Sequence, residues 1–126
     1  MRLGIVTPVL DDWESLAILL REIDRQLAAA GHHVHVFAVD DGSRLSMDPA
    51  SLQLGDRGAI VAIHVIRLAA NLGHQRAIAV GLIAASREAD LDAVIVMDSD
   101  GEDRPEDILR LIAEADANSG QIVLAR

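Results

Sequence analysis

The sequence of 126 residues contains no cysteine and no lysine, and Trp13 and Phe37 are its only two aromatic residues of the Phe, Tyr and Trp class. The absence of cysteine excludes disulfides, thiolate metal sites and cysteine nucleophiles. The absence of lysine excludes a Walker-type phosphate-binding loop and Schiff-base chemistry. Because aromatic side chains are so scarce, aliphatic residues and alanine must fill the core, and the chain is long enough to bury one.

Long apolar runs are also missing, since the stretch over residues 77–85 is too short to span a bilayer. No charged and then apolar leader opens the chain, so we expect a cytoplasmic protein, or one at the cytoplasmic face of the membrane. The formal net charge of -9 argues against a nucleic-acid partner. A phosphate-bearing ligand would therefore need positive charge from a metal ion, helix N-termini or arginines.

Segments with strand and helix patterns alternate along the chain. The patterns predict strands at residues 3–8, 33–40, 59–68, 93–97 and 121–125, and helices at 12–29, 74–87 and 105–117. Near-continuous apolar strands that alternate with helices predict an α/β fold, a Rossmann-like parallel sheet with helices on both faces. We expect one domain over residues 1–126, and one that is incomplete, because the chain ends on a strand without a covering helix.

Two carboxylates, Asp98 and Asp100, follow the apolar strand that ends at Met97. Alternate side chains of a strand point to the same side, so the two carboxylates can point together. Like charges held so close repel unless something neutralises them. Mg²⁺ suits this role, because it prefers carboxylate oxygens and keeps phosphate oxygens as further ligands. The pair predicts a metal site at the carboxyl edge of the sheet, serving a phosphate-bearing substrate.

Polar residues also follow the first three strands, and ligands of parallel sheets bind at this edge. These residues are Asp11 and Asp12, then Asp40, Asp41 and Ser43, then Arg67, Asn71, His74 and Gln75. Other interpretations remain for several of them. Asp11 with Glu14 and Asp103 with Glu106 fit helix capping boxes. The segment 40–43 fits a simple turn.

The basic residues allow similar alternatives. Arg67 and Arg76 suit either a phosphate or a neighbouring carboxylate, and His74 is a candidate because of its place on the rim. The three histidines at 32, 33 and 35 do not match a zinc pattern, so we expect them to be structural or exposed. No Gly-x-Gly-x-x-Gly follows the first strand, which weighs against a dinucleotide-binding domain.

Across its whole length the sequence resembles the family 2 glycosyltransferases of GT-A fold, especially the dolichyl-phosphate and polyprenyl-phosphate sugar transferases. The first element is the segment 7–12, similar to Pro-Val-Tyr-Asn-Glu with Leu10 for the aromatic residue. The others are Val-Asp-Asp-Gly-Ser at 39–43, Arg67 with Asn-Leu-Gly-His-Gln at 71–75, Asp-Ser-Asp at 98–100 and Glu-Asp-Arg-Pro-Glu at 102–106. Each element is common alone, whereas five in the same order are specific.

The resemblance implies roles for individual residues. The nucleotide-binding residues would be Pro8, Asp12, Asp40, Asp41, Arg67 and Asp98. Of these, Asp40 would contact the base and Asp41 would support the loop. The metal ligands would be Asp98, Asp100 and Glu102, holding Mg²⁺ or Mn²⁺ against the diphosphate. Glu102 stands where relatives carry a glutamine.

The resemblance also implies a function, namely metal-assisted and inverting transfer of a sugar from a nucleotide-sugar donor to an acceptor. The acceptor would be a polyprenyl phosphate or a glycan, in a cell-envelope role, and a full-length protein could associate with the membrane. In the family the general base and the acceptor groove follow the fifth strand. We therefore interpret the chain as a donor-binding part truncated before the acceptor-binding half, with a catalytic base beyond Arg126 and with its activity alone left open.

Two other classes compete with this interpretation. One is a non-catalytic nucleotide-binding or interaction module that retains the fold, and it would keep its partner binding if Asp98 and Asp100 were replaced. The other is a phospho-acceptor receiver domain, which resembles this pattern of acids on a parallel sheet. Known receivers need a lysine near the acidic pocket, and this chain has none.

Overall fold

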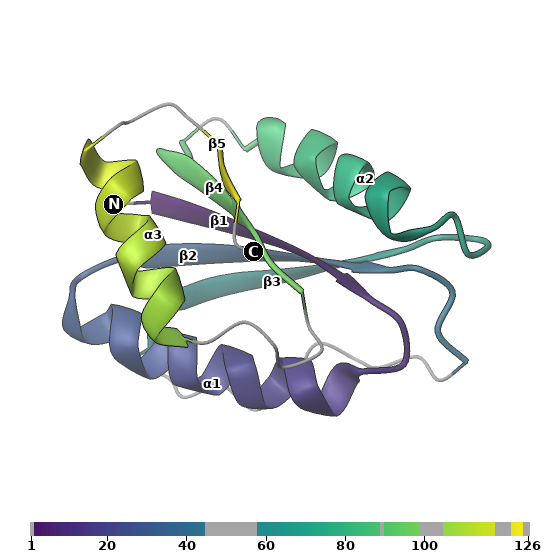
Figure 1. The fold of residues 1–126 in the computed structure, drawn as a ribbon, viewed down its shortest axis with the longest axis horizontal. Helices are drawn as coiled ribbons and strands as arrows, with labels where there is room; N and C mark the ends of the chain where they lie inside the picture. Colours follow the sequence, from purple (N-terminus) through teal and green to yellow (C-terminus); the bar gives the residue numbers. More distant parts are fainter. Residues whose placement is uncertain (1, 45–57, 89, 99–104, 118–121, 125–126) are drawn as a thin grey trace.

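The structure is a computed structural model that describes residues 2–44, 58–88, 90–98, 105–117 and 122–124 (Figure 1). Within them the strands are β1 (Arg2–Val9), β2 (His33–Asp40), β3 (Ile60–Arg67), β4 (Ala93–Val96) and β5 (Ile122–Leu124). The helices are α1 (Trp13–Ala29), α2 (His74–Ser86) and α3 (Pro105–Ala117). None of these helices, in the part that the structure describes, is long and apolar enough to cross a bilayer.

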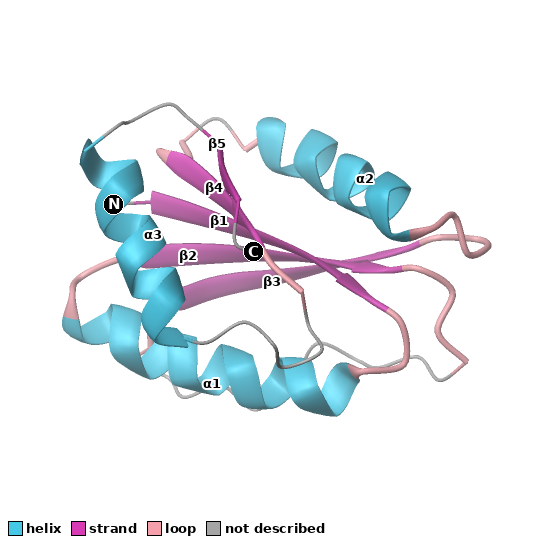
Figure 2. Ribbon diagram, viewed as in Figure 1, coloured by secondary structure: helices cyan, strands magenta, loops and turns pink. Residues whose placement is uncertain are grey.

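The strands form one parallel sheet in the order β3-β2-β1-β4-β5. Helix α2 covers one face of the sheet, while α1 and α3 lie together on the other (Figures 1 and 2). The predicted fold class is therefore confirmed. Because β1 has β2 on one side and β4 on the other, the chain turns in opposite directions at this point. Sheets of this kind bind ligands just outside such a switch point.

The larger of two apolar cores lies between the sheet and α1 with α3. Helix α1 buries Leu16, Leu20, Ile23 and Leu27, whose spacing of three and four places them on one face. Trp13, at the first position of the helix, is also buried. This packing fixes α1 directly after the loop that follows β1, and so fixes one wall of the carboxyl edge.

The smaller core lies between the sheet and α2, and it contains Val6, Phe37, Ala85 and Val96. Helix α2 approaches the sheet closely at Gly81. A Cβ atom added to Gly81 would lie 2.4 Å from Val6 Cγ1. The absence of a side chain there lets α2 rest directly on β1, which sets the height of its first residues above the carboxyl edge.

The capping box expected at Asp11 and Glu14 is wrong. The N-cap residue of α1 is Asp12, and no side chain caps the helix. Asp11 instead adopts a left-handed backbone conformation with φ of 62°. Its carboxylate accepts the N–H of Arg44 at 2.7 Å, and its own N–H donates to Ser43 Oγ at 2.9 Å. Asp11 therefore connects the loops after β1 and β2, which no short-range helix pattern can reveal. The other expected box involves Asp103, which lies outside the described residues.

Candidate functional site

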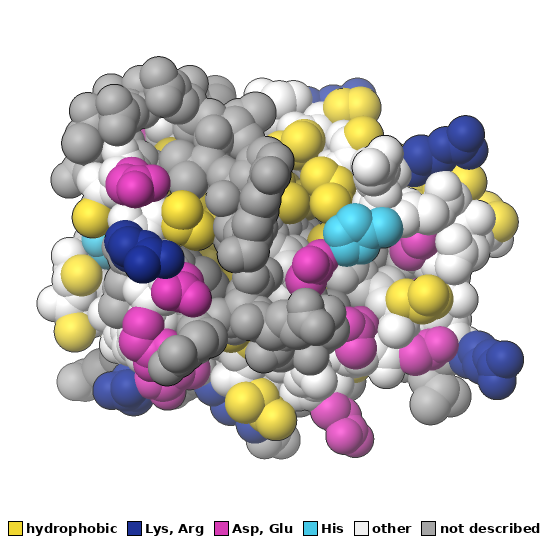
Figure 3. Space-filling model, in the orientation of Figure 1, with side chains coloured by type: hydrophobic (Ala, Val, Ile, Leu, Met, Phe, Trp, Pro, Cys, Tyr) yellow, Lys and Arg dark blue, Asp and Glu magenta, His cyan; other side chains and the backbone are white. Residues whose placement is uncertain are grey.

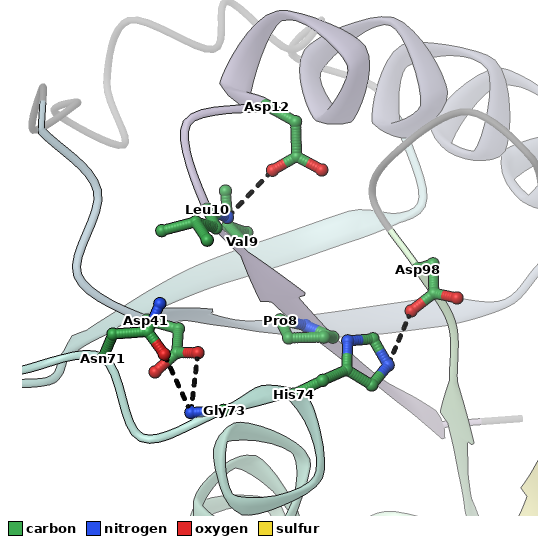
Figure 4. Close-up of a pocket in the computed structure, with 9 residues that line it drawn as sticks. All are labelled: Pro8, Val9, Leu10, Asp12, Asp41, Asn71, Gly73, His74 and Asp98. Carbon is green, nitrogen blue, oxygen red and sulfur yellow. Dashed lines mark hydrogen bonds and ion pairs between the residues drawn. The ribbon is translucent and has the colours of Figure 1, made fainter.

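A pocket of about 250 Å³ opens at the carboxyl edge of the sheet, where the loops after β1, β2 and β4 meet the start of α2 (Figure 4). Its walls come from segments far apart in the sequence. The lining residues are Pro8, Val9, Leu10, Asp12, Asp41, Asn71, Gly73, His74 and Asp98. The site therefore lies where the sheet topology places ligands, at the switch point beside β1.

His74 and Asp98 form a direct contact across the pocket. The Nε2 atom of His74 lies 3.0 Å from Oδ1 of Asp98, and the two side chains point toward each other in Figure 4. Both side chains are about half exposed, at 58% and 44%. His74 begins α2 and Asp98 follows β4. Their contact therefore connects two walls of the pocket that come from different segments of the chain.

Asp41 holds the loop that precedes α2. Its buried carboxylate accepts the N–H of Leu72 at 2.7 Å and the N–H of Gly73 at 3.2 Å. Asn71 Oδ1 also accepts the N–H of Gly73, at 3.0 Å. Gly73 has a φ of 95°, a conformation that suits glycine and few other residues. The carboxylate thus fixes the turn that delivers His74 to the pocket.

Asp40 precedes Asp41 but forms its hydrogen bond within the turn after β2. Its Oδ1 accepts the N–H of Ser43 at 2.8 Å, which closes the turn after β2, and only 4% of Asp40 is exposed. Ser43 in turn accepts the N–H of Asp11 through its hydroxyl. Asp40 therefore closes a turn after β2, and this turn also supports the loop after β1, while a functional role for the segment 40–43 stays a prediction.

The predicted site residues divide into three groups. Pro8, Asp12, Asp41 and Asp98 line the pocket. Asp40 and Arg67 do not line it. They lie opposite each other on the neighbouring strands β2 and β3, at the same edge of the sheet. Asp100 and Glu102 lie outside the described residues. The roles that the resemblance implies for all of these residues stay predictions.

A divalent cation is chemically compatible with what the structure describes of this site. Asp98 presents a half-exposed carboxylate, and oxygen is the ligand type that Mg²⁺ and Mn²⁺ favour. Among the described residues no three His, Asp or Glu side chains are close enough together to hold a metal ion. Asp98 is therefore the described residue that suits a metal ligand in this pocket, and its role as a ligand stays a prediction.

The pocket is acidic. Three of its lining side chains, those of Asp12, Asp41 and Asp98, are carboxylates, and His74 is the one histidine among the described lining residues. On the face shown in Figure 3, acidic side chains lie beside a histidine near the centre. An anionic ligand would be repelled here unless a cation or hydrogen-bond donors offset the charge.

Sequence reasoning missed much of the wall that carries no charge. Val9 and Leu10 line the pocket but carry no polar group that would mark them as site residues, and Gly73 lines it as well. The glycine before a helix was a usable signal, because Gly73 adopts a positive φ. No sequence signal predicted the contact between His74 and Asp98, because this contact depends on β4 lying beside β1.

A second pocket, of about 340 Å³, lies at the opposite end of the sheet and is lined in part by Arg2, His33 and His35. The ring of His35 stacks on that of His64 with centroids 6.0 Å apart, and His33 is exposed. His33 is thus exposed and His35 packs beside another ring, while the expectation that the three histidines at 32, 33 and 35 are structural or exposed rather than zinc ligands stays a prediction.

Comparison with known proteins gives one family and a set of relatives. The model of the family described as "Glycosyl transferase family 2" matches residues 4–126. The relatives are undecaprenyl-phosphate 4-deoxy-4-formamido-L-arabinose transferases. The one from Klebsiella pneumoniae is 32% identical over 117 residues, covering 91% of this chain and 34% of the relative. The one from Pseudomonas fluorescens is 35% identical over 116 residues, covering 90% and 32%. This chain spans about a third of the length of these curated relatives.

Proposed function

The chain belongs to glycosyl transferase family 2, and from that membership we propose that its pocket binds the nucleotide part of a nucleotide-sugar donor. The observation that carries the proposal is the convergence of Pro8, Asp12, Asp41 and Asp98 on one pocket at the switch point of the sheet. Its volume of about 250 Å³ is slightly below the range of roughly 300–1,000 Å³ for drug-sized ligands. It suits one part of a nucleotide-sugar rather than the whole donor.

The charge of the leaving group determines what the pocket must supply. Transfer of a sugar from such a donor releases a nucleoside diphosphate, and negative charge grows on it as the glycosidic bond breaks. We propose that a Mg²⁺ or Mn²⁺ ion held by Asp98, with Asp100 and Glu102 as further ligands, stabilises that charge. An acidic pocket in a lysine-free chain supports this assignment, because few other sources of positive charge exist.

The remaining residues of the pocket orient the donor. Pro8 and Asp12 form the wall on the β1 side, and Asp41 keeps the loop before α2 in place. A donor fixed in this way exposes its anomeric carbon to an acceptor oxygen on the face opposite the diphosphate, which inverts the configuration. We propose a polyprenyl phosphate as that acceptor, because the relatives are named for undecaprenyl phosphate. The catalytic base after Arg126 stays a prediction.

Calorimetry with nucleoside diphosphates tests the donor site. UDP and GDP are titrated into the chain with Mn²⁺, with Mg²⁺ and with EDTA, at two temperatures so that a vanishing enthalpy is not mistaken for an absence of binding. We expect one of the two nucleotides to bind with a metal and to lose at least about tenfold in affinity with EDTA, which corresponds to about 1.4 kcal/mol.

A matched pair of variants connects this binding to the pocket. Asp98→Asn removes one negative charge from the pocket and is expected to weaken the metal-dependent binding. Asp90→Asn removes the same charge at an exposed position, where Asp90 pairs with Arg2 at 3.0 Å, and should bind as the wild type does. A folded wild-type chain that binds neither nucleotide with either metal contradicts the proposed function.

A further inference from the structure

We propose that His74 is a diphosphate-binding residue, whose Nε2–H donates to a phosphate oxygen of the donor and is held by Asp98 until the donor arrives. The proposal rests on the proposed function and adds to it a residue to which neither the family match nor the relatives give a role. It starts from the contact of 3.0 Å between His74 Nε2 and Asp98 Oδ1 (Figure 4).

The tautomer of His74 follows from that contact. A carboxylate accepts hydrogen bonds only, so the nitrogen beside Asp98 must carry the hydrogen. The Nε2–H group therefore points into the pocket toward an anionic oxygen. Because 58% of the side chain is exposed, a ligand oxygen can reach the same hydrogen without a change in the fold.

The other lining side chains offer a phosphate little. Asp12, Asp41 and Asp98 are carboxylates, and Asn71, whose Oδ1 accepts the N–H of Gly73, offers a phosphate only its neutral Nδ2 amide as a donor. The chain has no lysine, and none of its arginines is among the described residues that line the pocket. His74 is thus the one basic side chain of the described lining, and it supplies a donor where anionic groups otherwise dominate.

The position of His74 on α2 adds to its suitability. The N-cap residue is Gly73, which has no side chain to cap the helix, and the first turn contains no acidic residue. The first backbone N–H groups of a helix carry partial positive charge and favour anions. These backbone N–H groups favour an anion bound near the start of α2, where His74 stands.

Exchange of partners explains why Asp98 and His74 touch before the donor binds. With the donor absent, the carboxylate satisfies Nε2–H and keeps the ring turned into the pocket. With the donor present, a phosphate oxygen replaces the carboxylate oxygen as acceptor, and no proton moves between groups. The ring of His74 then no longer competes with a cation for the carboxylate of Asp98.

Three measurements on His74→Ala separate loss of phosphate binding from loss of metal binding. In His74→Ala the affinity for the nucleoside diphosphate that binds wild type, measured by calorimetry with Mn²⁺, should fall about tenfold or more, because a hydrogen bond to a charged group is lost. Binding of Mn²⁺ alone, followed by electron paramagnetic resonance, should be equal to or tighter than in wild type, because Asp98 has lost a competitor. Affinity for the corresponding nucleoside, measured by ligand-observed NMR, should not change.

Two further variants separate donation from packing. His74→Gln retains an N–H donor at a similar reach and should bind the diphosphate within about threefold of wild type. His74→Glu has the shape of glutamine but repels phosphate, and should lose at least tenfold relative to it. This pair also replaces His74→Ala if that variant does not fold. His33→Ala, an exposed histidine at the amino end of β2, is the matched control and should bind as wild type does.

The outcomes distinguish the inference from the proposed function. Wild-type and His74→Ala chains that bind the diphosphate equally would overturn the role of His74 and leave the donor site intact. A parallel loss of Mn²⁺ and diphosphate in His74→Ala would show that His74 only orders the carboxylate, which also overturns it. A wild-type chain that binds no nucleotide would contradict the proposed function itself.

Discussion

Replacement of Gly81 with alanine tests whether α2 is positioned by its close approach to the sheet. The added Cβ would lie 2.4 Å from Val6 Cγ1 and 3.0 Å from Val39 Cγ2, whereas carbon atoms in contact are normally about 3.5–4.0 Å apart. Both valines belong to central strands and are fully buried, so they cannot turn away into solvent. Helix α2 must therefore lift by about 1 Å, and His74 at its start must move with it.

Two opposing contributions set the size of the effect. Overpacking of a filled core costs about 1–3 kcal/mol, and a contact as short as 2.4 Å belongs at the upper end. Alanine gains about 1 kcal/mol over glycine in helix propensity. We expect Gly81→Ala to lower the free energy of unfolding by about 2 kcal/mol, and Tm by roughly 6–10 °C for a domain of this size.

Urea and thermal unfolding measure this change, and two further variants interpret it. Ala79→Gly lies on the exposed side of the same helix and should cost about 0.5–1 kcal/mol through propensity alone. Val6→Ala removes the methyl group that collides, so the double variant with Gly81→Ala should be more stable than the sum of the two single changes by about 1–2 kcal/mol. Strict additivity, or a Gly81→Ala chain as stable as wild type, refutes the reasoning.

Substitutions at three more positions test contacts around the carboxyl edge and β3. Asp24→Ala should lower the free energy of unfolding in urea by about 2 kcal/mol, because this buried carboxylate accepts the N–H of Ile60 at 2.7 Å; Asp24→Asn keeps an acceptor and should lose less. Asp11→Ala should be about 1 kcal/mol less stable than Asp11→Gly, since both lose the contact with Arg44 but only glycine accepts φ of 62° without strain. Asp41→Ala should weaken nucleoside diphosphate binding about tenfold in calorimetry, because the loop before α2 loses the acceptor of its two backbone N–H groups.

Each of these predictions has a result that contradicts it. Equal stability of the alanine and asparagine variants at Asp24 would show that the hydrogen bond to β3 contributes little. Equal stability of the alanine and glycine variants at Asp11 would show that its backbone is not strained. Unchanged nucleotide affinity in Asp41→Ala would show that the loop keeps its conformation without the carboxylate.

The fold could be predicted from the sequence because its signals are local. The spacing of Leu16, Leu20, Ile23 and Leu27 specifies a one-sided helix, and the structure buries these four side chains. Apolar strands that end in turn residues specify a parallel sheet covered on both faces. Strand and helix ends agree with the predicted ones to within one or two residues, which is the normal uncertainty of such boundaries.

The location of the site was also predictable, because parallel strands bring their carboxyl ends to one edge. The partners within the site were not. Asp40 and Asp41 are neighbours in sequence and both are acidic, yet one closes its own turn and the other holds the loop before α2. Alternation along the strand sends the two side chains in different directions, and only the packing of the loops decides what each one meets.

Asp11 is a second residue whose partners could not be predicted from the sequence. The spacing of Asp11 and Glu14 is that of a capping box, and a capping residue needs nothing beyond its own helix. The contact that Asp11 makes with Ser43 and Arg44 depends on β1 and β2 being neighbours in register, with Val9 opposite Asp40. Asp11 contacts the distant loop after β2 instead of capping α1, and the local sequence around Asp11 is compatible with either contact.

The pairing of β1 with β4 has a consequence for synthesis on the ribosome. Val6 and Val96 lie side by side in the sheet, although most of the chain separates them. While the chain emerges, β1 and β2 can pair early, but the binding edge has no second wall until β4 arrives. The pocket at this edge therefore forms only after β4 has been synthesised, and a ligand that binds there during translation reports on the pairing of β1 with β4 rather than on that of β1 with β2.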